Sequence, residues 1–235
     1  MLKKILLGLV ALVVILLAVI LFRTFTYGGA ATGERVELPA APEVSADRAA
    51  NHLAEAIRFR TITVATGDPR PGQEGPWLDL HAWLETTYPA AHSAMNRELV
   101  PGTLTLLYTW QGSDASLDPL LLMAHQDVVP VNIGTEDDWT GAPFAGDIVD
   151  GYVYGRGALD DKGSLVALME AADALAADGF QPKRTVHFMF GHDEEVLGNG
   201  AEAGIALLKS RGITPVMALD EGFAIIDPSP LTGKP

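Results

Sequence analysis

The stretch LLLMAHQD, residues 120–127, decides the fold of this chain. It follows the breaker pair Asp118-Pro119, and it is apolar without interruption as far as Ala124. A short apolar run bounded by such a signal predicts a strand that is buried at the centre of a sheet. This strand would deliver His125 and Asp127 to the edge of the sheet.

Three further polar motifs stand where an apolar run or a tight turn ends. They are DDKG at 160–163, HDEE at 192–195 and DEG at 220–222. The sequence predicts strands over 185–190 and 216–219, and amphipathic helices over 164–177 and 200–209. Strands that alternate with helices indicate an α/β domain with a mostly parallel, mixed sheet and helices on both faces.

The segments before residue 120 contain two expected helices and one expected strand. Ser45 is a typical N-cap for a helix that reaches about Arg60. A second helical pattern covers 77–88 and is ended by Pro89, and an alternating β-rich stretch covers 103–110. Asp150-Gly151 predicts a tight turn.

Each polar motif has an ordinary explanation when it is taken alone. A histidine two residues before an aspartate is most often a surface coincidence, and Asp160-Asp161 before a helix often only caps it. Consecutive acids such as Glu194-Glu195 usually mark a solvated turn. Four such clusters at successive strand ends are different, because open α/β sheets gather their chemistry there. Imidazole and carboxylate are the ligands that divalent metals such as zinc take, so the set predicts a two-metal hydrolase centre.

Composition excludes several other classes of protein. The formal net charge of −14 argues against nucleic acid as a partner, since phosphate recognition needs basic patches. The chain has no cysteine, which rules out disulfide scaffolds and thiolate zinc sites. An α/β redox or nucleotide domain is disfavoured because Gly155-Arg156-Gly157 lacks the third glycine of a dinucleotide loop.

The N-terminus predicts a membrane anchor. An apolar run from Ile5 to Phe22 is just long enough for a bilayer core, which needs ~20 residues. We favour an uncleaved signal anchor, residues 1–27, over a cleaved signal peptide, although the small residues after Tyr27 leave cleavage open. Two lysines before the run and one arginine after it favour a single-pass protein whose catalytic domain lies outside the cytoplasm, periplasmic or extracellular. Residues 28–44 would be a tether, followed by the catalytic segment 45–235.

The motifs together resemble the M20 family of metallopeptidases. The resemblance rests on AHQDVVP at 124–130, on Trp139 with Pro143-Phe144, and on YGRGALDDKG at 154–163. The run GHDEE at 191–195, with Gly200-Ala201 after it, is similar to the branch that contains carboxypeptidase S and the secreted N-acyl amino acid hydrolase/synthases. The resemblance covers about Ser45 to the C-terminus. It implies a two-metal exopeptidase fold.

The resemblance also implies roles for individual residues. His125 would bind one metal with support from Asp127, and Asp160 would bridge both metals. Glu195 would ligate the second metal, and Asp220 the metal that His125 binds.

Catalysis would then depend on a neighbouring carboxylate. Glu194 would be the general base and acid that acts on a metal-bridging water, and Asp161 would support the site from behind the ligands. His192 would mark the branch of the family and would not be a ligand.

The activity that this implies is metal-dependent hydrolysis of amide bonds in peptides or N-acyl amino acids, of the carboxypeptidase or aminoacylase type. The cofactors would be two divalent ions. Family resemblance implies zinc, and the His–carboxylate ligands also admit cobalt or manganese. A deacylase acting on a non-peptide amide is the alternative within the same fold.

The chain departs from the family pattern in its second half. The family completes its second metal with a distant downstream histidine and inserts a smaller lid domain through which it dimerises. The six histidines of this chain all precede Asp220; they are His52, His81, His92, His125, His187 and His192. We therefore expect the N-terminal part of a longer catalytic domain, with a tail over 226–235 that has no regular structure. A homodimer is expected only if the lid exists. A catalytically incompetent, membrane-tethered metal-binding fragment or partner module is the alternative from a different class.

Overall fold

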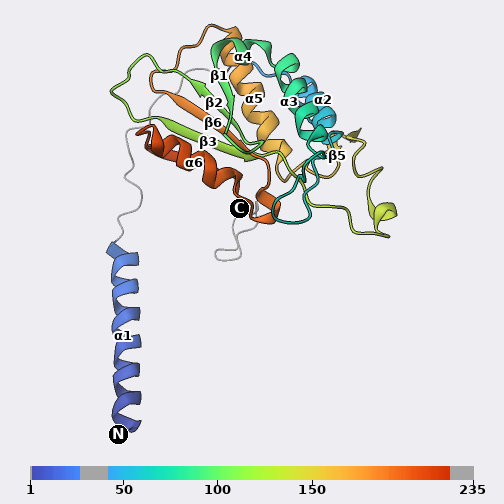
Figure 1. Cartoon of the computed structure of the whole chain (residues 1–235). Coiled ribbons are helices and arrows are strands. Elements are labelled where there is room, and N and C mark those ends of the chain that lie inside the picture. The colour runs from blue at the N-terminus through green and yellow to red at the C-terminus, as the bar shows by residue number, and fades with distance from the viewer. Residues whose placement is uncertain (1, 27–41, 223–235) are drawn as a thin grey trace. The chain divides into compact units, whose positions relative to one another are not determined.

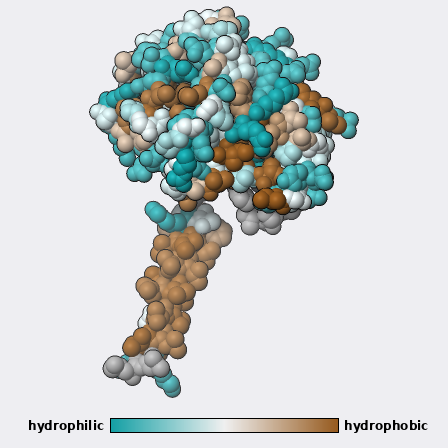
Figure 2. Space-filling view, turned by 45° about the vertical axis from the view of Figure 1, so that its right-hand side comes forward, coloured by the Kyte–Doolittle hydropathy of each residue, from teal (hydrophilic) through white to brown (hydrophobic). Residues whose placement is uncertain are grey.

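The computed structural model describes residues 2–26 and 42–222, which form two separate units. The expectations for most of the tether at 28–44 and for the tail at 226–235 lie outside the described residues. The first unit is the helix α1, Leu2–Thr26. It is long and apolar enough to cross a membrane, properties that a signal sequence shares. Its surface is apolar along its length (Figure 2).

The second unit contains the remaining helices and strands. Its longer helices are α2 (Ala46–Ile57), α3 (Gly75–Thr87), α4 (Pro89–Ala94), α5 (Lys162–Ala177) and α6 (Gly200–Ser210). Two short 3-10 helices are η1 (Glu136–Asp138) and η2 (Glu194–Val196). The strands are β1 (Asn96–Leu99), β2 (Leu106–Trp110), β3 (Leu120–His125), β4 (Asp147–Val149), β5 (Tyr152–Tyr154), β6 (Val186–Gly191) and β7 (Met217–Leu219).

The main sheet of the described residues is mixed and has five strands in the order β1-β2-β6-β3-β7. The strands β6, β3 and β7 run parallel, whereas β1 and β2 join by antiparallel pairing. This confirms the predicted mixed sheet and the central place of the strand that carries His125. Because β3 and β6 are parallel and in register at His125 and Gly191, their following loops meet at one edge.

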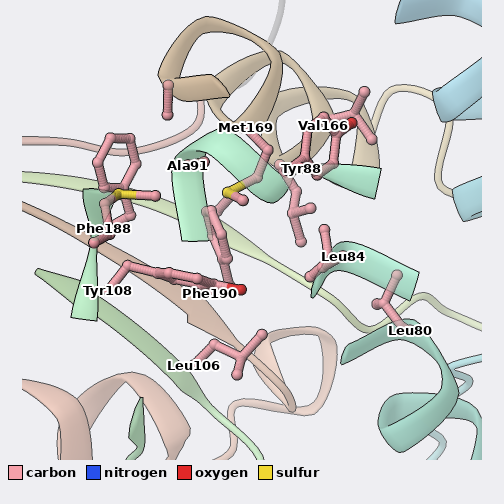
Figure 3. Packing of buried hydrophobic residues seen from close by; sticks show 14 of the residues in the cluster. Leu80, Leu84, Tyr88, Ala91, Leu106, Tyr108, Val166, Met169, Phe188 and Phe190 are labelled. Atoms are coloured by element: carbon pink, nitrogen blue, oxygen red, sulfur yellow. The ribbon is translucent and has the colours of Figure 1, made fainter. Parts of the chain in front are cut away.

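Helices cover both faces of this sheet, as predicted (Figure 1). Side chains alternate across a strand, so Leu106, Tyr108 and Trp110 of β2 face the helices α2 to α5, while Leu107 faces α6. Figure 3 shows the larger core, in which the Tyr108 and Phe190 rings lie 5.7 Å apart, centre to centre, beneath Met169 of α5. Burial of these large apolar groups is the main force that holds the helices to the sheet.

Local signals explain where the elements begin and end. Ser45 caps α2 as predicted, with its hydroxyl accepting from Arg48 N at 3.2 Å. The turn at Asp150-Gly151 joins β4 to β5, and both residues have positive φ, which suits a tight hairpin turn. Several short elements were not predicted. They are the strands β1, β4 and β5, the two 3-10 helices, and α4, which Pro89 begins at its first position after ending the preceding helical pattern.

A buried carboxylate ties α5 to α2 and α4. Asp173 accepts hydrogen bonds from the N–H groups of Ala90 and Ala91 at 2.9 and 3.0 Å, and pairs with Arg48 at 2.7 Å. Asp173→Ala would leave these donors unpaired in a buried place, and we expect the free energy of unfolding to fall by about 2–3 kcal/mol. Urea denaturation measures this, with exposed Asp178→Ala as control. Equal values for the two variants would contradict the role of Asp173.

Candidate metal centre

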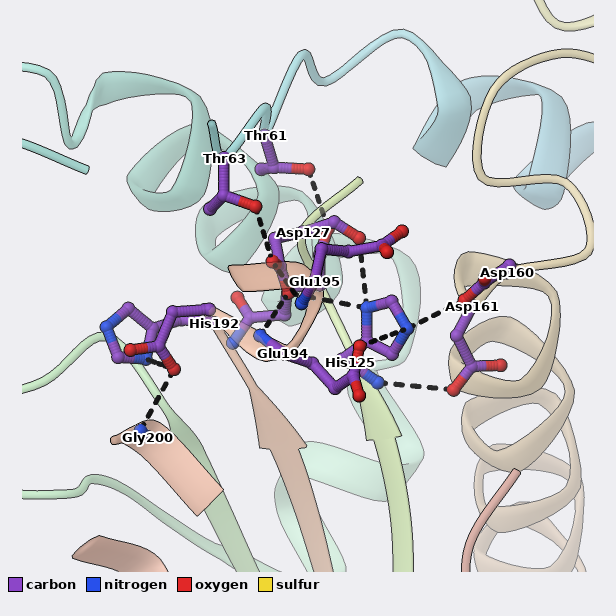
Figure 4. A network of polar contacts seen from close by, with 12 residues as sticks. Thr61, Thr63, His125, Asp127, Asp160, Asp161, His192, Glu194, Glu195 and Gly200 are labelled. Atoms are coloured by element: carbon purple, nitrogen blue, oxygen red, sulfur yellow. Dashed lines mark hydrogen bonds and ion pairs between the residues drawn. The ribbon is translucent and has the colours of Figure 1, made fainter. Parts of the chain in front are cut away.

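The loops after β3, β6 and β7 and the start of α5 bring acidic side chains around one imidazole (Figure 4). His125 ends β3 and is buried. Asp160 precedes α5, Glu194 and Glu195 follow β6, and Glu221 follows β7. The predicted convergence of these motifs at the sheet edge therefore exists in the structure.

The His125 ring is held so that one nitrogen faces the acidic groups. Its Nδ1 lies 3.0 Å from the carbonyl oxygen of Asp127 and 3.3 Å from Asp127 Oδ1. Its Nε2 lies 2.8 Å from Asp160 Oδ1. Burial lowers the pKa of the ring, but the carboxylates of Asp127 and Asp160 outweigh it and raise the pKa to about 10. The arrangement holds Nδ1 against the oxygens of Asp127 and directs Nε2 at the site, as a metal ligand requires.

Asp127 joins the loop after β3 to the loop after β6. Its fully buried carboxylate accepts hydrogen bonds from Thr63 Oγ1 at 2.7 Å, Glu194 N at 3.0 Å and Glu195 N at 3.1 Å. Burial opposes ionisation, but the hydrogen bonds from His125 and Thr63 outweigh it and hold the pKa of Asp127 below its usual range. Asp127 thus orients both the imidazole and the turn that carries the two glutamates.

The two glutamates point to different partners. Glu194 Oε2 lies 3.8 Å from His125 Nε2, and 46% of its side chain is exposed. Glu195 Oε1 accepts a hydrogen bond from Val129 N at 3.3 Å. Burial raises the pKa of both glutamates, and the charge of Asp160 adds to the effect in each. Glu194 therefore reaches solvent beside the imidazole, whereas Glu195 is fixed against the loop after β3.

The DDKG motif contacts both the end of β3, through its aspartates, and the end of α2, through its lysine. Asp160 is largely exposed and contacts His125, whereas buried Asp161 accepts a hydrogen bond from His125 N at 3.2 Å through Oδ2. Lys162 is fully buried, and its Nζ donates to the carbonyl oxygens of Ala56, at 3.0 Å, and Phe59. Burial lowers the pKa of Lys162 to about 7. Lys162 thus ties the turn that bears Asp160 to the end of α2.

After β7 the structure brings Glu221 to the imidazole. Glu221 Oε2 lies 3.7 Å from His125 Nε2, while Asp220 Oδ1 accepts a hydrogen bond from Glu221 N at 3.0 Å. Burial, together with the neighbouring carboxylates, raises the pKa of Glu221 to about 7. His125, Asp160 and Glu221 each offer an atom within 4.8 Å of the other two.

This donor set fits a divalent cation. An imidazole nitrogen and carboxylate oxygens are ligands of zinc, and bonds of about 2.1 Å in a tetrahedron place ligand atoms roughly 3.4 Å apart. The distances from His125 Nε2 to Asp160 and Glu221, 2.8 and 3.7 Å, lie on either side of that value. The raised pKa of Glu221 has its physical cause in burial among other negative groups, a situation that a bound cation would relieve.

The turn that follows β6 is closed by Asp193. Its carboxylate accepts from Asn199 N and Gly200 N, both at 2.9 Å, at the start of α6. Gly198 packs so tightly on this carboxylate that a Cβ there would overlap it. His192 is buried behind the turn, where its Nδ1 lies 3.0 Å from Thr105 Oγ1. His192 therefore belongs to the frame of the loop, and its expected place outside the ligand set stays a prediction.

Sequence reasoning missed three residues of the site. Glu221 was quoted in the DEG motif, but only its neighbour Asp220 was assigned a role. Thr63 gives no signal in the sequence, because a loop threonine is common and its partner Asp127 is far along the chain. Lys162 was quoted in its motif without a role, and only its burial reveals one.

Comparison with known proteins also points to metal-dependent hydrolases. The family described as "Peptidase family M20/M25/M40" matches residues 121–234. Carboxypeptidase S of Saccharomyces cerevisiae is 40% identical over 194 residues, which are 78% of this chain and 33% of the relative. The N-fatty-acyl-amino acid synthase/hydrolase PM20D1.1 of Danio rerio is 34% identical over 224 residues, 92% of this chain and 42% of the relative. The chain thus spans between a third and about two fifths of the length of these relatives.

Solved structures share the fold. Human carnosine dipeptidase 1 superposes with a TM-score of 0.60 at 23% identity, over 74% of this chain and 38% of that structure. The metallo-carboxypeptidase Sso-CP2 of Sulfolobus solfataricus gives a TM-score of 0.59 at 22% identity, over 75% and 38%. At these identities the likeness concerns the fold alone.

Proposed function

The chain belongs to the peptidase family M20/M25/M40, a family of hydrolases, and we propose that it carries the metal-binding and proton-transfer residues of an enzyme that cleaves amide bonds in peptides or N-acyl amino acids. The observation that carries this proposal is the group formed by His125, Asp160 and Glu221 beside Glu194. The substrate classes follow the names of the relatives, a carboxypeptidase and an N-fatty-acyl-amino acid synthase/hydrolase.

The ligands that we propose are His125, Asp160, Glu195 and Asp220, with Asp160 shared between two ions. Two divalent ions, zinc first and cobalt or manganese as alternatives, would polarise the scissile carbonyl and favour ionisation of water. The chain's own carboxylates would hold the ions and transfer the proton. Asp160 suits a bridging position because its side chain is 59% exposed and leaves one oxygen free of His125.

Glu194 would take the proton from the attacking water and pass it to the leaving amine. Its carboxylate stands 3.8 Å from His125 Nε2 and is half exposed, so it borders both the ligands and the space that a substrate enters. A base of this kind must reach within hydrogen-bonding distance of the water whose proton it abstracts. Asp127 would keep Glu194 there, because it accepts the hydrogen bond from Glu194 N.

Two neighbouring acids compete for the ligand position after β7. Glu221 contacts the imidazole, with its Oε2 3.7 Å from His125 Nε2. The pleat favours Asp220, because Ala218 pairs with Leu121 in the parallel ladder and side chains alternate along both strands. Asp220 would then share a face with Met123 and His125. We assign the role to Asp220 and treat Glu221 as its competitor.

The competition is settled by measuring metal content. Asp220→Asn is expected to lower the affinity for zinc by ~10–100-fold, while Glu221→Gln, which keeps the shape of the side chain, is expected to change it far less. Loss of a group that only orients a ligand already costs about 10–100-fold in metal affinity, and loss of a ligand is expected to cost at least as much. Equilibrium dialysis against zinc buffers measures both variants. The reverse order would assign the ligand to Glu221.

The placement of the enzyme is part of the proposal. Residues 1–27 would anchor it, 28–44 would tether it, and 45–235 would form the N-terminal part of the catalytic domain. The support is α1, whose length and composition suffice for one span, together with Lys3 and Lys4 before it and Arg23 within its last turn. This orientation puts the metal centre in the periplasm or outside the cell.

A second candidate is a membrane-tethered metal-binding module without turnover. One observation favours it: among the described residues, a single imidazole, that of His125, faces the acidic group. The number of ions in the native protein separates the two functions. Two ions per chain with hydrolysis of an N-acyl amino acid would support the enzyme, whereas one ion or none, without hydrolysis, would support the module.

A further inference from the structure

A cavity of about 570 Å³ lies between the end of α2 and the loops after β3 and before β4. We call it the Arg58–Arg60 pocket, since these two arginines line it together with Glu136 and an apolar wall. The apolar wall consists of Ile62, Pro130, Val131, Pro143, Phe144 and two alanines. A volume of this size is in the range of small-molecule sites, which run from about 300 to 1,000 Å³.

Neither guanidinium has an acidic partner among the described residues. Arg58 Nε donates to the carbonyl oxygen of Ala145 at 3.0 Å. Its two terminal nitrogens have no hydrogen-bond partner among the described residues. Arg60 lies over the Phe144 ring, with its Cζ 4.6 Å from the ring centre. Stacking of this kind fixes the plane of a guanidinium and leaves its N–H groups available at the edge.

A second cavity in the same unit provides the contrast. That cavity, of about 490 Å³, also contains an arginine, Arg211. Arg211 is paired with both carboxylate oxygens of Glu98, so its charge already has an acidic partner. The chain has 30 acidic and 16 basic residues, yet the part that the structure describes gives neither arginine of the Arg58–Arg60 pocket a carboxylate partner.

The pocket adjoins the metal centre without sharing its side chains. Val129 N donates to Glu195 Oε1 at 3.3 Å, and the next residue, Pro130, already lines the pocket. On the other wall, Ile62 forms a parallel bridge with Val128. The two sites are thus separated by one short stretch of backbone.

We propose that the Arg58–Arg60 pocket binds a small amphipathic anion, a carboxylate or phosphate attached to an apolar group. The planar N–H forks of two guanidiniums match either oxyanion, and Phe144 and Pro130 offer the apolar group a surface. Glu136 lines the same cavity and opposes the anion; it is exposed, and one of its oxygens accepts from Gly134 N at 2.8 Å. The binding needs neither metal nor turnover, so it stands apart from the proposed hydrolysis.

Fluorine NMR on the full chain in nanodiscs of zwitterionic lipid tests this, with protein-free nanodiscs as blank. The probes are 4-fluorobenzoate, 4-fluorophenyl phosphate and the neutral 4-fluorobenzamide. At least one anion is expected to bind saturably and the amide ~10-fold more weakly or not at all. The anion that binds more tightly identifies the ligand as a carboxylate or a phosphate.

Substitutions locate the site. Arg58→Gln and Arg60→Gln are each expected to weaken the anion by ~10-fold, the size of one charge-assisted hydrogen bond. Arg70→Gln is the matched control, because it removes the same charge from an arginine that pairs with Asp68 at 3.0 Å outside the pocket. Glu136→Gln is expected to tighten binding by ~3-fold, since it removes the opposing charge.

Several results would overturn the proposal. They are the absence of saturable binding for both anions, equal binding of the neutral amide, or an equal loss in Arg70→Gln. The Glu136→Gln variant tests the pocket even if the arginine variants fail to fold, because a gain in affinity cannot arise from unfolding. No gain in Glu136→Gln, together with no loss in either arginine variant, would place any anion binding elsewhere.

Discussion

Glu194→Gln in the native protein is expected to lower the turnover of amide substrates by ~10²–10⁴-fold without changing its metal content. Glutamine keeps the size of the side chain and can still accept a hydrogen bond, but it cannot take up a proton at neutral pH. The backbone of residue 194 remains fixed by Asp127, whose carboxylate accepts from Glu194 N at 3.0 Å. The loss should therefore appear in kcat and leave the structure of the site intact.

The measurement is the release of free amino acid from an N-acyl amino acid, together with metal analysis of the same samples. Glu202→Gln is the matched control, because Glu202 is an exposed acid in the first turn of α6, on the element that follows the same loop. Activity of Glu194→Gln close to that of the control would refute the role of Glu194 as base. A parallel loss of metal would instead make Glu194 a ligand.

Asp127→Ala is expected to lower the free energy of unfolding by about 3–5 kcal/mol, the cost of breaking a buried charged network by removing one partner. The substitution leaves the Thr63 hydroxyl and the N–H groups of Glu194 and Glu195 without their acceptor. It also removes the carboxylate oxygen 3.3 Å from His125 Nδ1 and leaves only the backbone carbonyl oxygen of residue 127, at 3.0 Å, to orient the ring. Stability and zinc affinity should therefore fall together.

Urea denaturation with and without zinc measures both effects. Asp79→Ala is the control, since Asp79 is an exposed acid on α3. A variant as stable as the control would mean that Asp127 does not stabilise the loop after β6. A destabilised variant that still binds zinc with unchanged affinity would limit Asp127 to a structural role and exclude orientation of His125.

The sequence was informative where an apolar run meets a breaker. The strand that carries His125 follows Asp118-Pro119, and the structure has it at Leu120–His125 between two parallel neighbours. The helix after DDKG was predicted for the same reason and ends within two residues of Gly179, which adopts positive φ. The strand β1 escaped prediction because Asn96–Leu99 is mostly polar and gains its place only by pairing with β2.

The site was predictable as a set of residues and not as a geometry. The pattern locates strand ends and the tight turn before DDKG, and this made His125, Asp160 and the Glu194-Glu195 pair candidates. The choice between Asp220 and Glu221 depends on how the chain leaves β7, which no local pattern determines. The contacts of Thr63 and Lys162 depend on segments 64 and more than 100 residues away along the chain. Such partners arise only when the tertiary fold forms.

The burial of Lys162 matters to anyone who would transplant this centre onto another scaffold. The proposed ligands lie on the sheet edge and on the turn before α5, so a graft of those parts alone looks sufficient. In such a graft Lys162 would be buried in the new scaffold without the carbonyl oxygens of Ala56 and Phe59 that accept its hydrogen bonds. A buried ammonium without acceptors is costly, and the turn that holds Asp160 would shift to release it. The smallest transferable unit therefore includes residues 46–60, although none of them contacts the proposed metal ligands.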